Sequence, residues 1–561
     1  MTKSAFIFTL FFTLIISLTA SAQSSPAAVK VTYRHMSNGK LLENQDPVIV
    51  ISSLLRTDII PQSLLEKKAK FPMEQFYVDR QTGSYVQIAH LSASKMTYTV
   101  DSLQIEKQIF ELTNETKKIL GYTCKKAKTE INSNKYDIWY TNDLKLKGAP
   151  TALGQNLGLV LEVERNGNYA ITATKVQPLK KIPAEIISIP RRQKPVDLLT
   201  YRHKLWRSRF TEIPVFRNEV INFTDKPKSN DSIERFASGT VIARKVKFPS
   251  IKPGSRVFVD AVQYSAGDAY DRTASIFLIP RDKKISYIDG LFTSHTKLPV
   301  YENGNGKQYH GVVRTGDYSP PVELMRFFTP FGIQHYNTIK LKNHVWEDSV
   351  SYRQEISDLI PLLSNKEVWI GANISNYDAG GHRISVNITI HPDERPTENF
   401  ALPLFMSYNL MEAAGQEYAT MFDVDVGLEV EFDLPHSVKN AQLRYITTGH
   451  GGWDGGDEFN PKENTICLDD EKVHSFIPWR SDCGSYRNYN PASGNFSNGL
   501  SSSDYSRSNW CPATVTPPTY IPLGDLPAGR HKIQIKIPQG PREGNSFSSW
   551  AVSGVLIGNS K

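Results

Sequence analysis

The sequence predicts an all-β protein in which an N-terminal antiparallel β domain precedes two β-sandwiches. Much of the chain consists of short segments with period-two alternation, such as Ser84–Ile88 and Met96–Val100, and helical periodicity is scarce. The 33 Pro and 35 Gly residues, together with 11% aromatic residues, are typical of strands separated by many turns. With 561 residues, the chain is also too long for a single hydrophobic core, so we expect several domains.

The first 22 residues have the pattern of a secretory signal peptide. Lys3 precedes an apolar run over residues 5–18, and small residues lead to an expected cleavage after Ala22. No cysteine follows the cleavage site, and no later segment is apolar over the length of a membrane span. We therefore expect an exported protein, periplasmic or secreted, without a membrane span, in a compartment that permits disulfides.

Residues 23–185 are predicted to form the N-terminal β domain. The segments 119–127, 138–141 and 148–161 resemble the GLPGLI family of exported bacterial proteins, with a degenerate form of its motif at residues 157–160. That family carries no established chemistry, and this part of the chain shows no convergent acids or histidines. The resemblance therefore implies an accessory domain.

The remaining domains are assigned from composition. Residues 186–229 are expected to be a linker and lead-in, because the stretch 189–195 is basic and marked by proline. Two sandwiches of ordinary size then fit residues 230–395 and 396–561, with the boundary at 391–397. The formal charge of +8 is spread without long basic runs, so a nucleic-acid partner is not indicated, and we expect a monomer.

The four cysteines do not have the spacing of a zinc site. Cys483 and Cys511 flank a loop rich in Ser, Asn, Gly and Tyr, which has too few apolar residues to fold alone and which a disulfide could clamp. We expect these two cysteines to be bridged. Cys124 and Cys467 are expected to be buried thiols, since free cysteine packs as a small hydrophobic residue.

The strongest candidate for a functional site is the loop before the apolar strand that ends at Ile279. This loop carries Asp271 and Arg272, and a carboxylate at the mouth of a strand is held by a rigid element yet open to a substrate. Arg272 could keep Asp271 ionised or grip a polar ligand. On its own the pair could equally be ordinary turn chemistry.

Several motifs in the second half of the chain support a functional interpretation. In chain order they are Ala237–Thr240, Asp268–Ala274, Arg326–Phe331, Thr448–Gly452, Gly456–Phe459 with Asn464–Ile466, and Ser506–Pro512. Together they resemble the bacterial peptide-N-glycosidase F family, in which the corresponding segments are a first strand, a catalytic aspartate loop, a turn, a glutamate segment (the fourth and fifth) and a segment that ends at a disulfide.

The resemblance implies a fold, an activity and a set of site residues. The implied fold is two adjacent jelly-roll sandwiches with the cleft along their interface, and the implied activity is hydrolysis of the bond between asparagine and the innermost N-acetylglucosamine of N-linked glycans. The partners would be N-linked glycoproteins and glycopeptides, without a cofactor or metal. The implied residues are Asp271 and Glu458 as catalytic acids, Tyr270, Arg272, His450, Gly452, Arg507 and Trp510 around the substrate, and the pair Cys483 and Cys511 as a disulfide.

These residue types suit amide hydrolysis. The reaction requires a water to attack the side-chain carbonyl, an oxyanion to be stabilised, and the glycosylamine nitrogen to be protonated as it leaves. Two carboxylates with different pKa values can divide the proton transfers, and an arginine can support the developing negative charge. The sequence does not say which of Asp271 and Glu458 is the acid.

The sequence departs from the family pattern in three places. The family's third acid falls on Asn373 or Ser375, neither of which is acidic, and Asp378 could replace it only if the loop is re-formed. Two further cysteines are absent, with Gly456 and Asn460 in their places. Gly452 stands where the family has a bulky side chain, so we expect room for a core α1,3-fucose.

Alternatives stay open for each part of this interpretation. Asp271 and Glu458 could be turn carboxylates, and Tyr270, Trp453 and Trp510 could be core aromatic residues. His450, Asp454, Asp457 and Glu458 could hold a metal, although acidic glycine-rich loops are more often solvated. A catalytically inactive glycan-binding protein, or a glycoside hydrolase that uses the same two carboxylates, would also fit the sequence.

Overall fold

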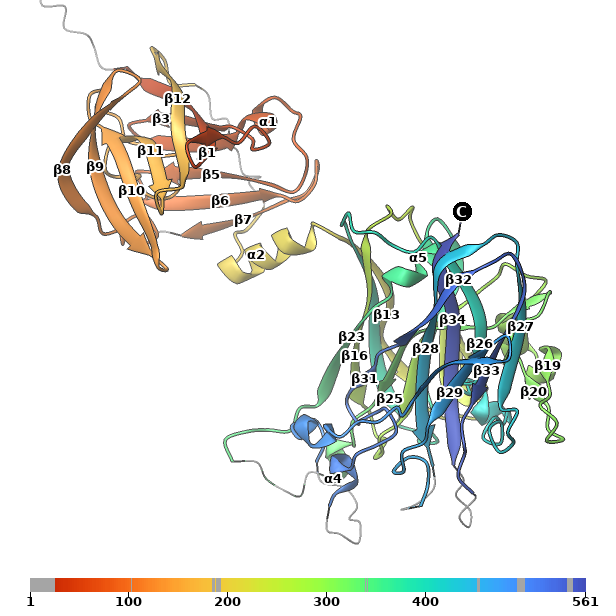
Figure 1. Cartoon of the computed structure of the whole chain (residues 1–561). Helices are drawn as coiled ribbons and strands as arrows, with labels where there is room; N and C mark the ends of the chain where they lie inside the picture. The colour runs from red at the N-terminus through yellow and green to blue at the C-terminus, as the bar shows by residue number, and fades with distance from the viewer. Residues whose placement is uncertain are drawn as a thin grey trace, which may run out of the picture. The chain divides into compact units, whose positions relative to one another are not determined.

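The computed structural model divides the chain into two compact units, Met1–Arg209 and Phe210–Lys561. It describes residues 26–560 except 102, 184–186, 188–192, 337, 339, 341, 452–454, 492–499 and 542–547. The expected signal peptide therefore lies outside the described residues. The predicted all-β class is confirmed: antiparallel sheets dominate both units (Figure 1).

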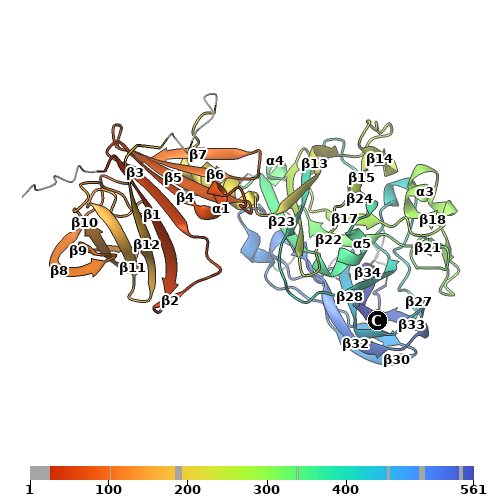
Figure 2. The same ribbon diagram turned by 90° about the horizontal axis from the view of Figure 1, so that it is seen from above.

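The first unit is built on one antiparallel sheet of twelve strands, ordered β7-β6-β5-β4-β3-β1-β12-β11-β10-β9-β8, with β2 paired to β1. The two ends of this sheet run in clearly different directions (Figure 2). Its strands are β1 (Ala28–Ser37), β2 (Lys40–Leu41), β3 (Val48–Ser53), β4 (Arg56–Pro61), β5 (Met73–Asp79), β6 (Ser84–His90), β7 (Met96–Asp101), β8 (Glu111–Ile119), β9 (Tyr122–Ile131), β10 (Asn134–Thr141), β11 (Leu159–Arg165) and β12 (Tyr169–Leu179), and a short helix α1 (Gln62–Leu65) follows β4.

The residues expected to link the domains contain a helix and a strand. Helix α2 (Leu198–Arg207) begins at Asp197, whose side chain accepts the backbone N–H of Thr200 at 2.9 Å and so caps the helix. Tyr201 and Leu205 are four residues apart on one face, where they pack on Ala89 of the first unit. Strand β13 (Thr211–Ile221) then opens the second unit.

The second unit contains two sandwiches, the arrangement that the family resemblance implied. In the first, the sheet β13-β25-β16-β23 faces the sheet β14-β15-β24-β17-β22-β31. The strands not yet given bounds are β14 (Glu234–Phe236), β15 (Val241–Lys247), β16 (Arg256–Ser265), β17 (Thr273–Ile279), β22 (Val322–Phe328), β23 (Ser349–Glu355), β24 (Glu367–Ile374), β25 (His382–His391) and β31 (Val515–Thr516).

The second sandwich pairs the sheet β26-β34-β28-β32 with the sheet β27-β33-β29-β30. Its strands are β26 (Phe400–Met406), β27 (Leu428–Leu434), β28 (Val438–His450), β29 (Asn464–Leu468), β30 (Glu471–Phe476), β32 (Thr519–Leu526), β33 (Gly529–Lys536) and β34 (Ser549–Ser560).

Short elements connect these strands in the second unit. They are the helices α3 (Tyr287–Phe292), α4 (Ile333–Tyr336) and α5 (Ile360–Leu363), the two-residue strands β18 (Ile285–Ser286), β19 (Val300–Tyr301), β20 (Tyr309–His310) and β21 (Tyr318–Ser319), and the 3₁₀ turns η1 (Ala237–Gly239), η2 (His295–Lys297), η3 (Ser357–Leu359), η4 (Glu412–Ala414), η5 (Cys483–Tyr486) and η6 (Ser502–Asp504). In the part of the chain that the structure describes, no helix has the length and apolar character of a membrane-spanning segment.

One expected strand is wrong. Ala237–Thr240 does not extend the sheet, because Ala237, Ser238 and Gly239 all have positive φ and form the turn η1, so strand β15 begins at Val241. A Cβ at Gly239 would lie 2.5 Å from the carbonyl oxygen of Asn222, which leaves glycine as the residue that fits.

The two sandwiches share packing as well as a boundary. Strand β31 begins 124 residues after the end of β25, the preceding strand of the first sandwich, yet Arg326 and Phe327 of β22 pair with Thr516 and Val515 of β31. The core of the first sandwich also includes Val555 and Ile557 of β34. Six of the seven residues of β17 are therefore buried, which explains why its sequence is apolar on both faces.

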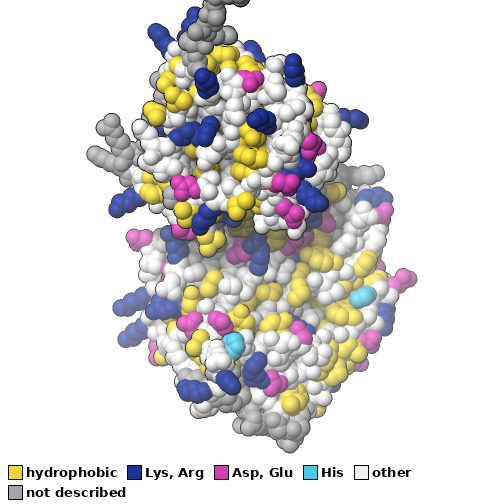
Figure 3. Space-filling model, turned by 90° about the vertical axis from the view of Figure 1, so that its left-hand side faces the viewer, with side chains coloured by type: hydrophobic (Ala, Val, Ile, Leu, Met, Phe, Trp, Pro, Cys, Tyr) yellow, Lys and Arg dark blue, Asp and Glu magenta, His cyan; other side chains and the backbone are white. Residues whose placement is uncertain are grey.

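The surface carries mixed charge. On the face drawn in Figure 3, Lys and Arg side chains are interspersed with Asp and Glu side chains. This distribution agrees with the charge pattern of the sequence, in which basic residues do not cluster.

The predicted disulfide between Cys483 and Cys511 is confirmed, and Cys124 and Cys467 are buried free thiols. The bridge spans 28 residues, so the chain-entropy model assigns it about 3 to 4 kcal/mol. We expect the double variant Cys483→Ala/Cys511→Ala to unfold at correspondingly lower urea concentration. Wild-type protein treated with a reductant should match the variant, and an unchanged urea midpoint in both would contradict the prediction.

Candidate active site

The loop before β17 is held by a buried ion pair. Asp268, which is 1% exposed, receives Nε and Nη2 of Arg272 at 2.6 and 3.0 Å and lies 3.3 Å from Nε2 of His382. Burial opposes its ionisation, but the hydrogen bonds from His382 and Arg272 outweigh that effect and hold the pKa of Asp268 well below its usual range. Thr329 bonds the backbone N–H of Arg272 at 2.8 Å. These contacts fix the position of Asp271 between Asp268 and the strand.

Glu458 comes from the loop between β28 and β29. Its carbonyl oxygen accepts the backbone N–H of Ser508 at 2.9 Å, and its Oε2 accepts the backbone N–H of Gly451 at 3.4 Å. The glutamate is therefore tied both to the end of β28 and to the segment that carries Arg507. Its side chain stays 18% exposed.

Arg507 joins the two carboxylates. Its Nη1 donates to Oε1 of Glu458 at 2.5 Å and lies 3.0 Å from Oδ2 of Asp271. The guanidinium is 1% exposed, stacks 4.2 Å above the ring of Trp510, and donates Nη2 to the carbonyl oxygen of Ser502. Arg507 therefore hydrogen-bonds Glu458 and forms an ion pair with Asp271.

The pKa values of both acids are displaced upward. Burial raises the pKa of Glu458 to about 7, against the opposing charge of Arg507 and with a further contribution from Asp271. Burial also raises the pKa of Asp271, again against Arg507. Two acids beside one cation favour the state in which the pair holds a single proton. Such a pair can give and take protons near neutral pH.

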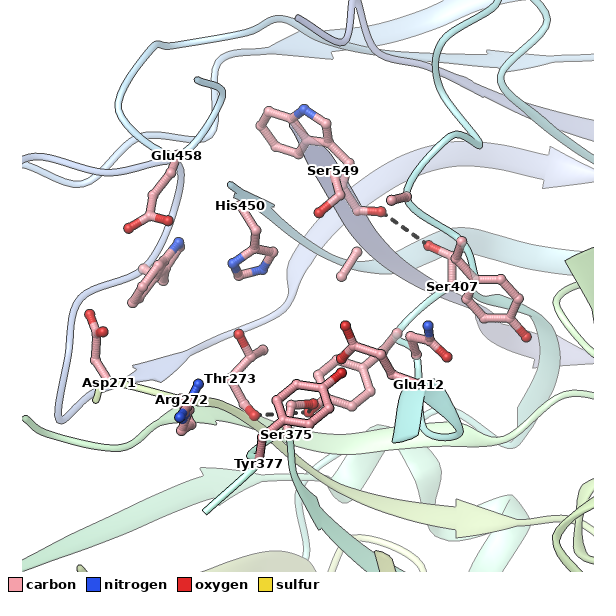
Figure 4. Close-up of a pocket in the computed structure, with 17 residues that line it drawn as sticks. Asp271, Arg272, Thr273, Ser375, Tyr377, Ser407, Glu412, His450, Glu458 and Ser549 are labelled. Atoms are coloured by element: carbon pink, nitrogen blue, oxygen red, sulfur yellow. Dashed lines mark hydrogen bonds between the residues drawn. The ribbon is translucent and has the colours of Figure 1, made fainter. Parts of the chain in front are cut away.

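A cavity of about 360 Å³ opens at these acids (Figure 4). Five of the predicted residues line it: Asp271, Arg272, His450, Glu458 and Trp510. The rest of its wall is polar or aromatic except for two alanines and consists of Thr273, Ser375, Tyr377, Ser407, Tyr408, Asn409, Glu412, Tyr418, Ala419, Ser549, Trp550 and Ala551. Both sandwiches contribute to the wall, so the cavity lies at their interface.

Comparison with known proteins identifies the family. Residues 212–390 match the model described as peptide-N-glycosidase F, N terminal, and residues 417–557 match the model of its C-terminal domain. A solved structure of PNGF-II is 53% identical, covers 95% of this chain and 100% of its own, and has a TM-score of 0.90. A second PNGF-II structure is 52% identical, covers 95% and 98%, and has a TM-score of 0.87. The chain belongs to the peptide-N-glycosidase F family.

The match extends to the N-terminal unit. Residues 31–203, in which the sequence resembles the GLPGLI family, match the model described as N-glycanase peptide, N-terminal domain. PNGase F from Flavobacterium meningosepticum, described as a glycosylasparaginase, is 16% identical, covers 63% of this chain and 96% of its own, and has a TM-score of 0.41. A comparison with curated proteins finds no match.

The other site residues that the family resemblance implied do not all lie on the cavity wall. Arg507 lies behind the cavity wall and contacts both acids. Trp510 lines the cavity and also packs in the interior of the protein, where it stacks on Phe328 at 4.3 Å and donates Nε1 to the carbonyl oxygen of Gly449. Tyr270 is 53% exposed, with the guanidinium of Arg272 over its ring, and lies off the described wall of the cavity. Gly452 lies outside the described residues.

The positions expected for the family's third acid do not supply one. Asn373 is buried, donates to the carbonyl oxygen of Thr240 and accepts the hydroxyl of Tyr408 at 2.7 Å. Ser375 lines the cavity. Asp378 accepts the backbone N–H groups of Gly380 and Gly381 at 2.7 and 2.9 Å, so it caps its own loop.

The metal alternative finds no support in the contacts of Asp457. Its carboxylate is fully buried and accepts Nε1 of Trp550 at 2.8 Å and the backbone N–H of Gly540 at 3.0 Å. Asp454 lies outside the described residues. Within the described ranges, His, Cys, Asp and Glu side chains do not form a group of three or more that could hold a metal.

Sequence reasoning missed Glu412, a third acid on the cavity wall. It stands in the turn η4 of the second sandwich, across the cavity from Glu458 (Figure 4). Burial raises the pKa of Glu412, while Tyr377 and Arg272 oppose the shift. The only signal in the sequence is an acid between Met411 and Ala413, which is too common to indicate a site.

We expect Glu412→Gln to weaken substrate binding, because a charged hydrogen-bond acceptor on the wall would be replaced by a neutral amide. A hydrogen bond to a charged group contributes about 1.5 to 3 kcal/mol, which corresponds to a KM increase of roughly 10- to 100-fold. Initial-rate kinetics on a glycopeptide would measure this change in KM. Glu417→Gln, an exposed acid five residues further and off the wall, is the matched control, and equal effects of both variants would contradict a role for Glu412.

Proposed function

We propose that the protein hydrolyses the amide bond between asparagine and the innermost N-acetylglucosamine of N-linked glycans. The products are an intact glycan and a peptide in which Asp replaces Asn. The observation that carries the proposal is the bridge of Arg507 between Asp271 and Glu458 at the cavity, in a chain of the peptide-N-glycosidase F family. The substrates are accordingly N-linked glycoproteins and glycopeptides.

Glu458 is the base in this proposal. Arg507 lies closer to Glu458, at 2.5 Å, than to Asp271, at 3.0 Å, and so favours the ionised form of Glu458 while Asp271 keeps the proton of the pair. A pKa of about 7 suits a base that works near neutral pH. Glu458 takes a proton from a water whose oxygen bonds to the carbonyl carbon of the asparagine side chain.

Asp271 is the acid. As the bond between carbon and nitrogen breaks, Asp271 gives its proton to the glycosylamine nitrogen, and the electron pair of the broken bond stays on that nitrogen. The carbonyl carbon keeps the oxygen of the water and becomes the carboxyl group of Asp. Exchange with solvent then returns the pair to its starting state.

Mass spectrometry of a glycopeptide tests the reaction. The proposal predicts an intact released glycan together with conversion of Asn to Asp, and Asp271→Asn should abolish both. A peptide that keeps one N-acetylglucosamine would indicate a glycoside hydrolase instead. Binding of the glycopeptide without any release would indicate an inactive glycan-binding protein.

We also propose that the enzyme accepts a core α1,3-fucose. Support comes from Gly452, which stands where the family has a bulky side chain, and from the small side chains of Ser375 and Ala419 on the cavity wall. The test compares matched glycopeptides with core α1,3-fucose, core α1,6-fucose or none. Activity on the α1,6-fucosylated peptide without activity on the α1,3-fucosylated peptide would refute this proposal.

We further propose that the enzyme is exported as a monomer and acts outside the cytoplasm. The Cys483–Cys511 disulfide supports this location, since such bonds persist in oxidising compartments. Fractionation of cells that make the full-length chain would test export, and light scattering would test the monomer. Retention of an uncleaved chain in the cytoplasm would contradict export.

A further inference from the structure

His450 ends strand β28 inside the cavity. Its ring packs against Trp510 and Phe328, and it occupies the middle of the cluster of side chains drawn in Figure 4. Nε2 of the ring lies 2.7 Å from Oγ1 of Thr448. Among the described residues the ring makes its hydrogen bond through Nε2, which leaves Nδ1 for a ligand in the cavity that His450 lines.

Thr448 also contacts a fully buried arginine. Nη1 of Arg326 donates to Oγ1 of Thr448 at 2.9 Å and to the carbonyl oxygen of Ala551 at 2.7 Å. The remaining guanidinium nitrogens bind Glu323 at 3.0 and 2.6 Å. An arginine in such an ion pair carries donors only, so Thr448 must be the acceptor in its bond with Arg326.

This bond determines the direction of the next one. The Thr448 hydroxyl is buried, and its contacts with the described residues are those with Arg326 and His450. Since Arg326 uses one of its lone pairs, the hydroxyl hydrogen finds an acceptor only at Nε2 of His450. Nε2 is then unprotonated, and the proton of the neutral imidazole resides on Nδ1.

The surroundings of His450 keep the imidazole neutral. Burial, together with the charges of Arg326 and Arg507, lowers the pKa of His450 to about 3. Three acids share the cavity wall with His450: Glu458, which hydrogen-bonds Arg507, Asp271, which lies 3.0 Å from Arg507, and Glu412. The ring therefore presents a neutral N–H donor to the cavity.

We propose that His450 donates its Nδ1–H to an amide carbonyl oxygen of the substrate, and that Arg326 fixes this tautomer through Thr448. His450 is the residue that touches the substrate, and Thr448 and Arg326 are positioning residues. The carbonyl belongs either to the asparagine side chain or to the 2-acetamido group of the first sugar. This inference rests on the proposed function for its substrate, but the tautomer itself can be measured without any reaction.

Nitrogen NMR on histidine-labelled full-length protein tests the tautomer, with the His450 signals assigned from their loss in His450→Phe. The proposal predicts a protonated Nδ1 and an unprotonated Nε2 from about pH 6 to 8, where an ordinary histidine titrates. Thr448→Val removes the hydroxyl at similar volume and should give a mixture of tautomers, whereas Thr448→Ser should keep the wild-type pattern. A protonated Nε2 in the wild-type protein would overturn the proposal, even if the Thr448→Val variant does not fold.

Kinetics on matched glycopeptides, with N-acetylglucosamine or glucose linked to asparagine, identify the carbonyl. If it is the asparagine carbonyl, His450→Phe should lower kcat by about 10²-fold or more on both substrates, as expected for the loss of one oxyanion donor. If it is the acetamido carbonyl, the variant should raise KM about tenfold on the first substrate and leave the second unaffected, the cost of one hydrogen bond. Unchanged kcat and KM on both would overturn the proposal, and an inactive wild-type protein would instead refute the proposed function.

Discussion

Asp271→Asn is expected to lower kcat by about 10²- to 10⁴-fold, the usual contribution of one general acid or base. Asparagine has nearly the shape of aspartic acid but cannot give a proton to the leaving nitrogen. Because Arg507 keeps its hydrogen bond to Glu458 when its ion pair with Asp271 is lost, the loss should fall on kcat and leave KM within a few-fold. Single-turnover measurements on a fluorescent glycopeptide would separate the chemical step from binding.

Asp358→Asn is a matched control for this experiment. Asp358 is likewise buried beside an arginine, with Oδ2 2.9 Å from Nε of Arg444 and 3.1 Å from the hydroxyl of Tyr520, and burial raises its pKa. It lies off the described cavity wall, so its replacement should lower stability and leave kcat unchanged. Similar losses of kcat in both variants would show that Asp271 acts through the fold alone.

Glu458→Gln is expected to lower kcat/KM and to abolish its dependence on pH. In the wild-type enzyme kcat/KM should rise with pH through about 7, because only the ionised form of Glu458 can take a proton from water. The variant should be slower by about 10²- to 10⁴-fold and should show no such rise. Glu463→Gln, an exposed acid of the same loop, should keep the wild-type profile.

The same acid has a consequence for stability. The pKa of Glu458 is raised from 4.5 to about 7 in the folded protein, so its protonated form favours folding. Compared with Glu458→Gln, the wild-type protein should have the largest advantage in free energy of unfolding below about pH 4.5. It should lose this advantage as the pH rises through about 7. Thermal unfolding at several pH values measures the difference, and a constant difference would mean that burial does not raise this pKa.

Much of the fold could be predicted from the sequence because strand patterns are local. The alternation in Ser84–Ile88 and the apolar run of β17 both became strands. Helix α2 was overlooked although Asp197, Tyr201 and Leu205 carry its cap and its apolar face, because proline and basic residues upstream favoured a linker. The strand expected at Ala237 is wrong because Ala237, Ser238 and Gly239 have positive φ, and Gly239 lies too close to Asn222 for a side chain.

The site also contains some residues that the sequence reveals and others that it does not. Asp271, Glu458 and Arg507 stand in motifs that could be recognised, and the structure brings them together. Glu412 could not be found, because a single acid in a short turn has no pattern and reaches the cavity only through the packing of two sandwiches. The tautomer of His450 depends on Arg326, which lies 124 residues earlier, so local sequence does not reveal it.

The pairing of β31 with β22 bears on how such enzymes can be recombined. Because a piece of the C-terminal half completes a sheet of the N-terminal half, a cut near residue 395 would leave the edge of β22 open beside Thr329, which holds the catalytic loop. The two sandwiches therefore have to be kept together when such enzymes are recombined, and neither can be exchanged alone. A chimera that takes its second sandwich from a distant relative must therefore match the foreign β31 to the resident Arg326 and Phe327 before its active site can form.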